Sequence, residues 1–124
     1  MNLSKDLMAA SSTPLVLAII AEGETYGYEI VKRVEELSGG ALTWTDGMMY
    51  PLLHRLEHQG YLRSLWRVAD TGRKRKYYAI TPAGKQVIVE QRQQWELVNE
   101  ALNKVWKEFN DKMQGSDDHG YQPA

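Results

Sequence analysis

His54, Glu57 and His58 are the residues whose types and spacing most clearly match a known chemical motif. They stand in the segment HRLEH, and H-x-x-E-H is the signature of one class of zinc protease. Residues four apart on a helix lie side by side, so the two imidazoles could bind one zinc ion. The alternative is that HRLEH lies on the outward face of a helix that contacts another molecule.

The rest of the sequence gives the metal hypothesis little support. A catalytic zinc needs a third protein ligand, and the only other histidine, His119, falls in a polar C-terminal segment. The sequence has no cysteine, no Gly-x-Ser-x-Gly elbow and no glycine-rich phosphate loop. A chain of 124 residues also leaves little room for a substrate cleft. We therefore predict no catalytic residue, no metal site and no cofactor.

Basic residues are concentrated in one part of the chain. The whole sequence has a net charge of -1, but between His54 and Lys76 seven basic residues face only two acidic ones. Such a patch is typical of a surface that meets a polyanion, although charged runs are more often solvated faces. The patch needs a structural context before it indicates a function.

Length and composition indicate one soluble domain. The chain is 43% hydrophobic and 25% charged, as in ordinary globular proteins. The absence of cysteine suits a reducing compartment. The apolar run at residues 14–21 is too short to cross a bilayer. We expect a cytoplasmic protein without membrane contact.

Helical periodicity dominates the first sixty residues. Residues 15–20 predict a helix that ends at Gly23, with Pro14 in its first turn and Ser12 or Thr13 as its cap. Residues 3–10 are also helical in pattern, either continuous with this helix across a kink at Pro14 or separate from it. The segment YGYEIVKRVEEL predicts a second helix, which ends before Gly39 and Gly40.

HRLEH belongs to a third predicted helix, TDGMMYPLLHRLEHQG, with Thr45 as its cap and Gly60 as its stop. Its apolar stripe comprises four residues: Met49, Leu52, Leu53 and Leu56. His54 and His58 lie on the opposite face. HRLEH would therefore contribute Leu56 to the core and its histidines to the outer surface.

The pattern then changes to that of strands. YLRSLWRV and RKYYAIT are rich in aromatic and β-branched residues, are joined by ADTG, and predict a hairpin. Thr81 and Pro82 open a last helix, which we expect to end near Met113. Apolar residues recur along it at seven-residue intervals, so its apolar face requires a partner. The segment after residue 113 predicts a disordered tail.

Two helices followed by a basic hairpin predict a winged helix-turn-helix, in which the third helix enters the major groove. The predicted fold is mainly α with a two-stranded β-wing and a long C-terminal helix. We expect a DNA-binding domain at residues 1–80, a dimerisation helix at residues 81–113 and the tail at residues 114–124. His54, Arg55 and, as a further candidate, His58 would then be presented to bases; the alternative for the two histidines is a plain solvated pair.

Three segments, TYGYEIVKRVEEL, MMYPLLHRLEHQGYL and GRKRKYYAITPAGK, occur in an order and spacing that resemble the PadR family of bacterial transcriptional regulators. The resemblance implies a homodimeric repressor that binds operator DNA. The single long helix at the C-terminal end is similar to the smaller PadR subfamily, which includes multidrug-responsive repressors. A two-fold dimer implies a roughly palindromic operator.

The resemblance also implies roles for individual residues. Tyr28 and Tyr50 match family tyrosines near the DNA backbone, and residues 73–76 match the basic wing. With the third helix, the candidate DNA-binding residues are Tyr28, Thr45, Met48, Tyr50, His54, Arg55, Arg73, Lys74, Arg75 and Lys76. The candidate dimer interface, in which the long helix crosses the partner's first and last helices, comprises Leu15, Ile19, Trp95, Val98, Leu102, Val105 and Phe109.

Trp95 allows two interpretations. It matches a tryptophan that multidrug-responsive relatives place across the dimer centre, where an aromatic effector can bind between two indoles. It equally fits a heptad position that fills the interface. The sequence thus predicts a DNA-binding repressor that forms a homodimer through its long helix. The alternatives are a metal-binding protein or metalloenzyme using HRLEH, and a winged-helix module that binds other proteins.

Overall fold

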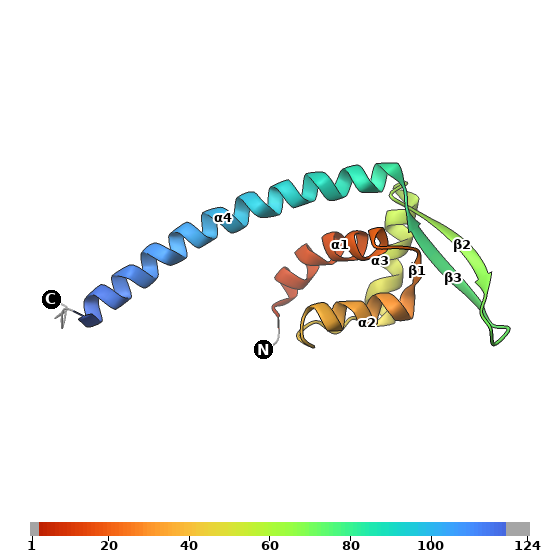
Figure 1. Cartoon of the computed structure of the whole chain (residues 1–124), viewed down its shortest axis with the longest axis horizontal. Coiled ribbons are helices and arrows are strands. Elements are labelled where there is room, and N and C mark those ends of the chain that lie inside the picture. The colour runs from red at the N-terminus through yellow and green to blue at the C-terminus, as the bar shows by residue number, and fades with distance from the viewer. Residues whose placement is uncertain (1–2, 119–124) are drawn as a thin grey trace. The chain divides into compact units, whose positions relative to one another are not determined.

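The computed structural model describes residues 3–118. They form two units, of which the first ends at Glu90 and the second begins at Gln91. The first unit contains α1 (Lys5–Ala21), β1 (Thr25–Tyr26), α2 (Gly27–Leu37), α3 (Asp46–His58), β2 (Leu62–Val68), β3 (Lys74–Ile80) and the first turns of α4 (Pro82–Asp118). Within it, the hairpin of β2 and β3 extends beyond the three helices (Figure 1). The second unit is the remainder of α4.

Helix α1 runs through Pro14 without a break. Its cap is Ser4, whose hydroxyl accepts a hydrogen bond from the Leu7 N–H at 3.2 Å, rather than Ser12 or Thr13. A proline inside a helix removes one backbone hydrogen bond. Burial of the following residues offsets that loss, because Val16 and Leu17 are fully buried. Residues 3–10 and 14–21 are therefore parts of one helix.

The core of the first unit consists mainly of buried apolar residues of α1, α2 and α3, and Leu42, Trp44, Leu62 and Tyr78 complete it. Ile30 and Val34 of α2 are fully buried. The predicted stripe of α3 is confirmed, since its four members Met49, Leu52, Leu53 and Leu56 are at most 5% exposed. The predicted cap is confirmed as well: the Thr45 hydroxyl accepts a hydrogen bond from the Met48 N–H.

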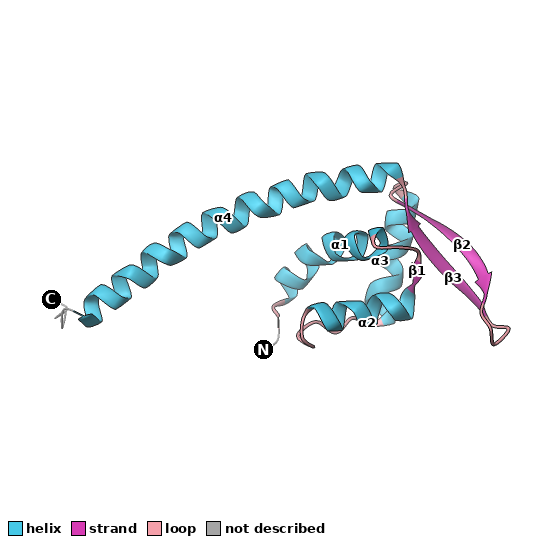
Figure 2. Cartoon of the chain, in the orientation of Figure 1, coloured by secondary structure: helices cyan, strands magenta, loops and turns pink. Residues whose placement is uncertain are grey.

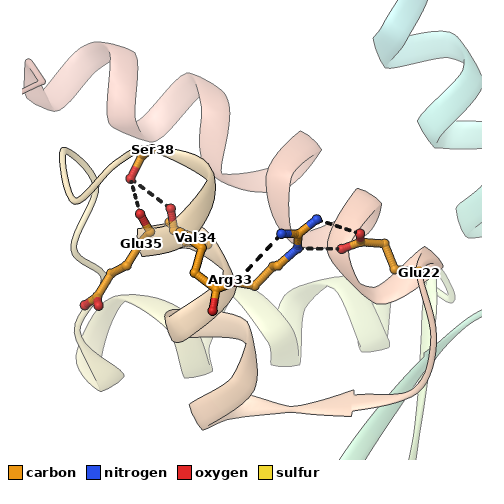
Figure 3. A network of polar contacts seen from close by, with 6 residues as sticks. Glu22, Arg33, Val34, Glu35 and Ser38 are labelled. Atoms are coloured by element: carbon orange, nitrogen blue, oxygen red, sulfur yellow. Dashed lines mark hydrogen bonds and ion pairs between the residues drawn. The ribbon is translucent and has the colours of Figure 1, made fainter.

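Polar contacts fix α2 against α1 and close its C-terminal end (Figure 3). Arg33 donates two hydrogen bonds to the carboxylate of Glu22, at 3.1 and 2.9 Å. These bonds lower the pKa of Glu22. At the end of α2 the Ser38 hydroxyl donates to the Val34 carbonyl and accepts from the Leu42 N–H. The loop that leads to α3 is thereby held close to the helix it leaves.

The sheet has three strands in the order β1-β3-β2, all antiparallel (Figure 2). The predicted hairpin is present, with Leu62 opposite Ile80 and Val68 opposite Lys74. Strand β1 was not expected. It pairs Thr25 with Tyr78 and Tyr26 with Tyr77, and two residues are too few to show an alternating pattern. Through β1, the sheet reaches the first residue of α2.

Helix α4 begins as predicted and continues beyond its expected end. The Thr81 hydroxyl accepts a hydrogen bond from the Gly84 N–H and donates one to the Gly60 carbonyl. The helix runs to Asp118, because Gly115 lowers helix propensity without imposing a stop. Residues 114–118 of the expected tail are thus helical, and residues 119–124 lie outside the described residues. None of the helices in residues 3–118 is long and apolar enough to span a membrane.

Candidate nucleic-acid interface

The two faces of the β2–β3 hairpin carry different residues, because successive side chains of a strand point to opposite sides. The face that meets α3 carries Ser64, Trp66, Val68, Lys74, Lys76 and Tyr78. The opposite face carries Arg63, Leu65, Arg67, Arg75 and Tyr77. Hydrogen bonding of Ser64 to Glu57 of α3 identifies the first face as the one against the helix.

A hollow of about 690 Å³ lies between the hairpin, the outer face of α3 and the start of α2. We call it the α3–wing groove. Its walls are largely aromatic and basic. It is lined by Tyr26, Gly27, Tyr28, Tyr50, His54, Trp66, Arg73, Lys74, Arg75, Lys76 and Tyr78.

Seven of the ten residues predicted from the sequence to contact DNA line this groove: Tyr28, Tyr50, His54, Arg73, Lys74, Arg75 and Lys76. Tyr28 is the most exposed of the aromatic residues among them, at 71%. His54 projects from the exposed face of α3, as the apolar stripe predicted. One continuous surface therefore joins the third helix to the wing.

The other three predicted residues lie elsewhere. Thr45 uses its hydroxyl to cap α3. Met48 is half-buried against the core. Arg55 donates a hydrogen bond to the Thr13 hydroxyl of α1 at 3.3 Å and, with Met48, lines a separate hollow between α1 and α3. Helical spacing placed Arg55 beside His54, but the contact with α1 turns its guanidinium away from the groove.

Glu57 connects α3 to the wing. Its carboxylate accepts a hydrogen bond from the Ser64 hydroxyl and forms an ion pair with Lys76. The hydrogen bond, and secondly the ammonium charge, hold the pKa of Glu57 below its usual value although burial opposes this. Lys76 also lies over the ring of Tyr78. Lys76 is thus engaged within the domain and is less available than its neighbours to an external anion.

Three arginines of the basic patch start from the opposite face of the hairpin and are engaged within the domain, although Arg75 and its partner Tyr26 also line the groove. Glu24, which precedes β1, forms ion pairs with Arg67 and Arg63. The guanidinium of Arg75 lies 4.5 Å from the centre of the Tyr26 ring. These contacts hold β1 to the hairpin. Among the described residues, Arg73 and Lys74 take part in neither an ion pair nor a cation–π contact, so of the hairpin's basic residues they carry the uncommitted charge.

The geometry does not favour a metal site at HRLEH. A metal ion would compete with Ser64 and Lys76 for the Glu57 carboxylate. Across residues 3–118, no three potential histidine or carboxylate ligands converge. His119, the third histidine, lies outside the described residues.

Helix α4 has a long exposed apolar face beyond residue 90. Five of the seven residues predicted for the dimer interface belong to α4 and are between 39% and 62% exposed in the single chain: Trp95, Val98, Leu102, Val105 and Phe109. Trp106 and Met113 are also exposed. Of the two residues predicted on α1, Leu15 is half-buried, whereas Ile19 is 5% exposed and belongs to the core of its own chain.

The sequence matches the transcriptional regulator PadR-like family over residues 16–90. The chain belongs to this family. It is 40% identical over 88 residues to the transcriptional regulator Rv3488 of Mycobacterium tuberculosis, a match that covers 70% of this chain and 78% of the relative. The PadR family consists of transcriptional regulators rather than enzymes.

Two further PadR relatives extend the comparison. The structure of the PadR-like regulator BC4206 from Bacillus cereus is similar with a TM-score of 0.73 at 27% identity, covering 82% of this chain and 97% of that one. The similarity confirms the winged-helix fold class. The negative transcriptional regulator PadR of Bacillus subtilis is 28% identical over 71 residues, 57% of this chain. The match spans only 39% of that relative's length.

Sequence reasoning missed Trp66, Tyr26 and Tyr78, which also line the groove. Trp66 occupies a position opposite Lys76, and strand alternation would have placed it on the same face as the lysines. Tyr26 was missed because its strand, β1, has only two residues and therefore shows no alternating pattern. Glu24 was missed as an anchor because its partners are 39 and 43 positions away in the chain.

Proposed function

We propose that this PadR-family regulator is a repressor that binds a roughly palindromic operator as a homodimer. The observation that carries the proposal is the α3–wing groove, in which the outer face of α3 and the basic wing form one surface. Helix-turn-helix proteins place the second helix of the motif in the major groove and use flanking elements on the backbone. Here α3 would be that helix.

Phosphate contacts would come from three places around the groove. Arg73 and Lys74 offer uncommitted positive charge at the hairpin. Tyr28 and Tyr50 present hydroxyl groups from α2 and α3. The N-terminal end of α2 has no side-chain cap, so its free N–H groups and helix dipole favour an anion there. Such contacts position a protein on duplex DNA and make its affinity salt-dependent.

Base recognition would depend mainly on His54. It lies on the exposed face of α3 and within the groove, where an imidazole can donate to or accept from base edges. We assign smaller roles to Thr45, Met48 and Arg55, since each is engaged by α1 or by the end of its own helix.

Dimerisation would bury the apolar face of α4. A helix that exposes Val98, Leu102, Val105 and Phe109 in water is expected to associate. A symmetric pair would present two copies of α3 about one DNA turn apart, roughly 34 Å. Leu15 remains a candidate on α1. Ile19 is left out because it offers little surface to a partner.

Repression and induction are separate parts of the proposal. Repression is supported by the name of the Bacillus subtilis relative, a negative regulator. Trp95 is 39% exposed in the single chain, which suits an interface residue and equally a site for an aromatic effector. Release from DNA by an aromatic small molecule stays a prediction.

The test is a titration of the protein into a fluorescent duplex taken from upstream of its own gene. Binding is measured at two salt concentrations, with and without a chelator, and against a shuffled duplex of equal length. We expect tight, salt-sensitive binding that prefers the upstream duplex and ignores the chelator. Equal weak binding to both duplexes would instead favour a protein-association module, and loss of binding on chelation would favour metal dependence.

A further inference from the structure

Two large apolar side chains are exposed side by side on the groove-facing side of the wing. Trp66 and Val68 of β2 are each 66% exposed. They stand opposite Lys76 and Lys74 of β3. Single exposed apolar residues are common on protein surfaces. An exposed tryptophan beside an exposed valine on a two-stranded ribbon is less common than a single exposed apolar residue, and it requires an explanation.

Packing within the domain does not account for this pair. On the same face of β2, Leu62 is 2% exposed and belongs to the core. Beyond Ser64, toward the tip of the hairpin, the β2 side chains of this face are again apolar, but they lie outside the core. Trp66 and Val68, together with Arg67 and Lys74, line a second hollow of about 460 Å³ on the wing. The apolar surface therefore extends beyond what the chain itself covers.

The charges around the pair indicate the chemistry of its partner. Lys74 is the cross-strand neighbour of Val68, and Arg73 precedes it at the end of the hairpin turn. A partner must bring negative charge to these cations and apolar surface to the indole at the same time. A duplex groove does both, because phosphates line its rim while deoxyribose and base edges form its interior.

We propose that Trp66, supported by Val68, contacts the sugar and base edges of the operator where the wing meets the duplex. The inference rests on the proposed function. Trp66 also lines the α3–wing groove together with His54 of α3, so both side chains face the same space. The contact supplies apolar affinity that does not depend on counterion release, in addition to the salt-dependent contribution of Arg73 and Lys74.

The test compares the salt dependence of operator binding for Trp66→Ala and Lys74→Ala. Trp66→Ala should weaken binding by roughly tenfold at every salt concentration, as expected for removal of an apolar side chain from an interface. The slope of log affinity against log salt should stay unchanged. Lys74→Ala should make that negative slope shallower, by about 0.9 for each phosphate that the variant no longer neutralises. Trp66→Phe should recover most of the affinity.

Two controls separate the interpretations. Leu37→Ala removes an exposed apolar side chain at the far end of α2 and should leave binding unchanged. Sedimentation of Trp66→Ala without DNA should match the wild type. A change in its oligomeric state would assign the pair to an interface between copies and overturn the inference.

The inference and the proposed function fail in different ways. If the wild-type protein does not bind the duplex, the proposed function fails first. If the wild type binds, two results would contradict the apolar contact and leave the proposed function intact. In the first, Trp66→Ala keeps full affinity; in the second, its loss of affinity comes only with a shallower slope of log affinity against log salt.

Discussion

The carboxylate of Glu57 on α3 lies 3.5 Å from Nζ of Lys76 on β3. The Ser64 hydroxyl of β2 donates a hydrogen bond to the same carboxylate. One side chain of α3 therefore contacts both strands of the hairpin. Because Lys76 and Glu57 are each about 30% exposed, the pair is neither fully solvated nor deeply buried, and its first role is to fix the angle between helix and hairpin.

Replacing Glu57 with glutamine should destabilise the protein by about 1 kcal/mol near neutral pH, since the carboxylate charge that attracts Lys76 is removed. The folded state lowers the pKa of Glu57, so its contribution is present above the ordinary glutamate range and disappears as pH falls through the lowered pKa. Urea unfolding at one protein concentration should thus show a difference at pH 7 that shrinks as pH falls below the ordinary glutamate range. A difference that stays constant with pH would contradict the assignment.

Arg73 and Arg67 should differ in their effect on DNA binding although both belong to the basic patch. Arg73 forms no ion pair among the described residues, whereas Arg67 is paired with Glu24. Arg73→Ala should make the negative slope of log affinity against log salt shallower, by about 0.9 for each phosphate that the variant no longer neutralises. Arg67→Ala should leave the slope nearly unchanged and reduce thermal stability instead. Equal slopes for the two variants would count against the division of the patch.

His54→Ala should change the order of preference among single-base variants of the operator, because His54 lies in the groove. His58→Ala is the matched control. It removes the other imidazole of HRLEH, which is exposed one turn further along α3 and does not line the groove. Competition binding against a panel of duplexes measures both. If both variants changed the order of preference in the same way, the two histidines would have to act together, contrary to this prediction.

Tyr78→Phe should leave the protein as stable as the wild type or raise its free energy of unfolding by up to about 1 kcal/mol. Tyr78 is 1% exposed, and its hydroxyl finds no hydrogen-bond partner in the described part of the chain. Burial raises the pKa of Tyr78 to about 12. The wild type should therefore lose stability as pH rises from about 10 toward the raised pKa, and the variant should lose less. Tyr61→Phe, at a half-buried tyrosine, is the control for thermal unfolding.

Leu102→Asp should convert the dimer to monomers, because a carboxylate on the apolar face of α4 would be buried without a partner. Lys104→Asp introduces the same side chain on the opposite side of the helix and should leave the dimer intact. Sedimentation velocity distinguishes the two. A dimer that survives Leu102→Asp would place the interface elsewhere.

Periodicity predicted those parts of the fold that bury long apolar stripes. The stripe of α3, its Thr45 cap and the Thr81 cap of α4 are all present. The helix through Pro14 and the strand β1 depend on interactions with residues far along the chain. Burial of Val16 and Leu17 compensates the proline, and β3 supplies the partners of β1. Local sequence patterns contain neither interaction.

The candidate site was predictable as a set of residue types and less so as a geometry. Composition identified the basic patch, and helical spacing placed His54 on the outer face of α3. Neither composition nor spacing revealed that Lys76 pairs with Glu57 or that Arg67 pairs with Glu24. They also did not reveal that Arg55 turns toward Thr13. Charge counts treat all seven basic residues alike, whereas tertiary interactions decide which of them can meet a phosphate.

The pairing of β1 with β3 joins residues about fifty positions apart and has a consequence for synthesis. A ribosome must release the chain through Ile80 before Thr25 and Tyr26 can pair. Until then α2 lacks the strand that fixes its first residue, and non-local pairing of this kind forms late. Nascent or truncated chains that stop within the hairpin should therefore be unable to compete with complete protein for the operator.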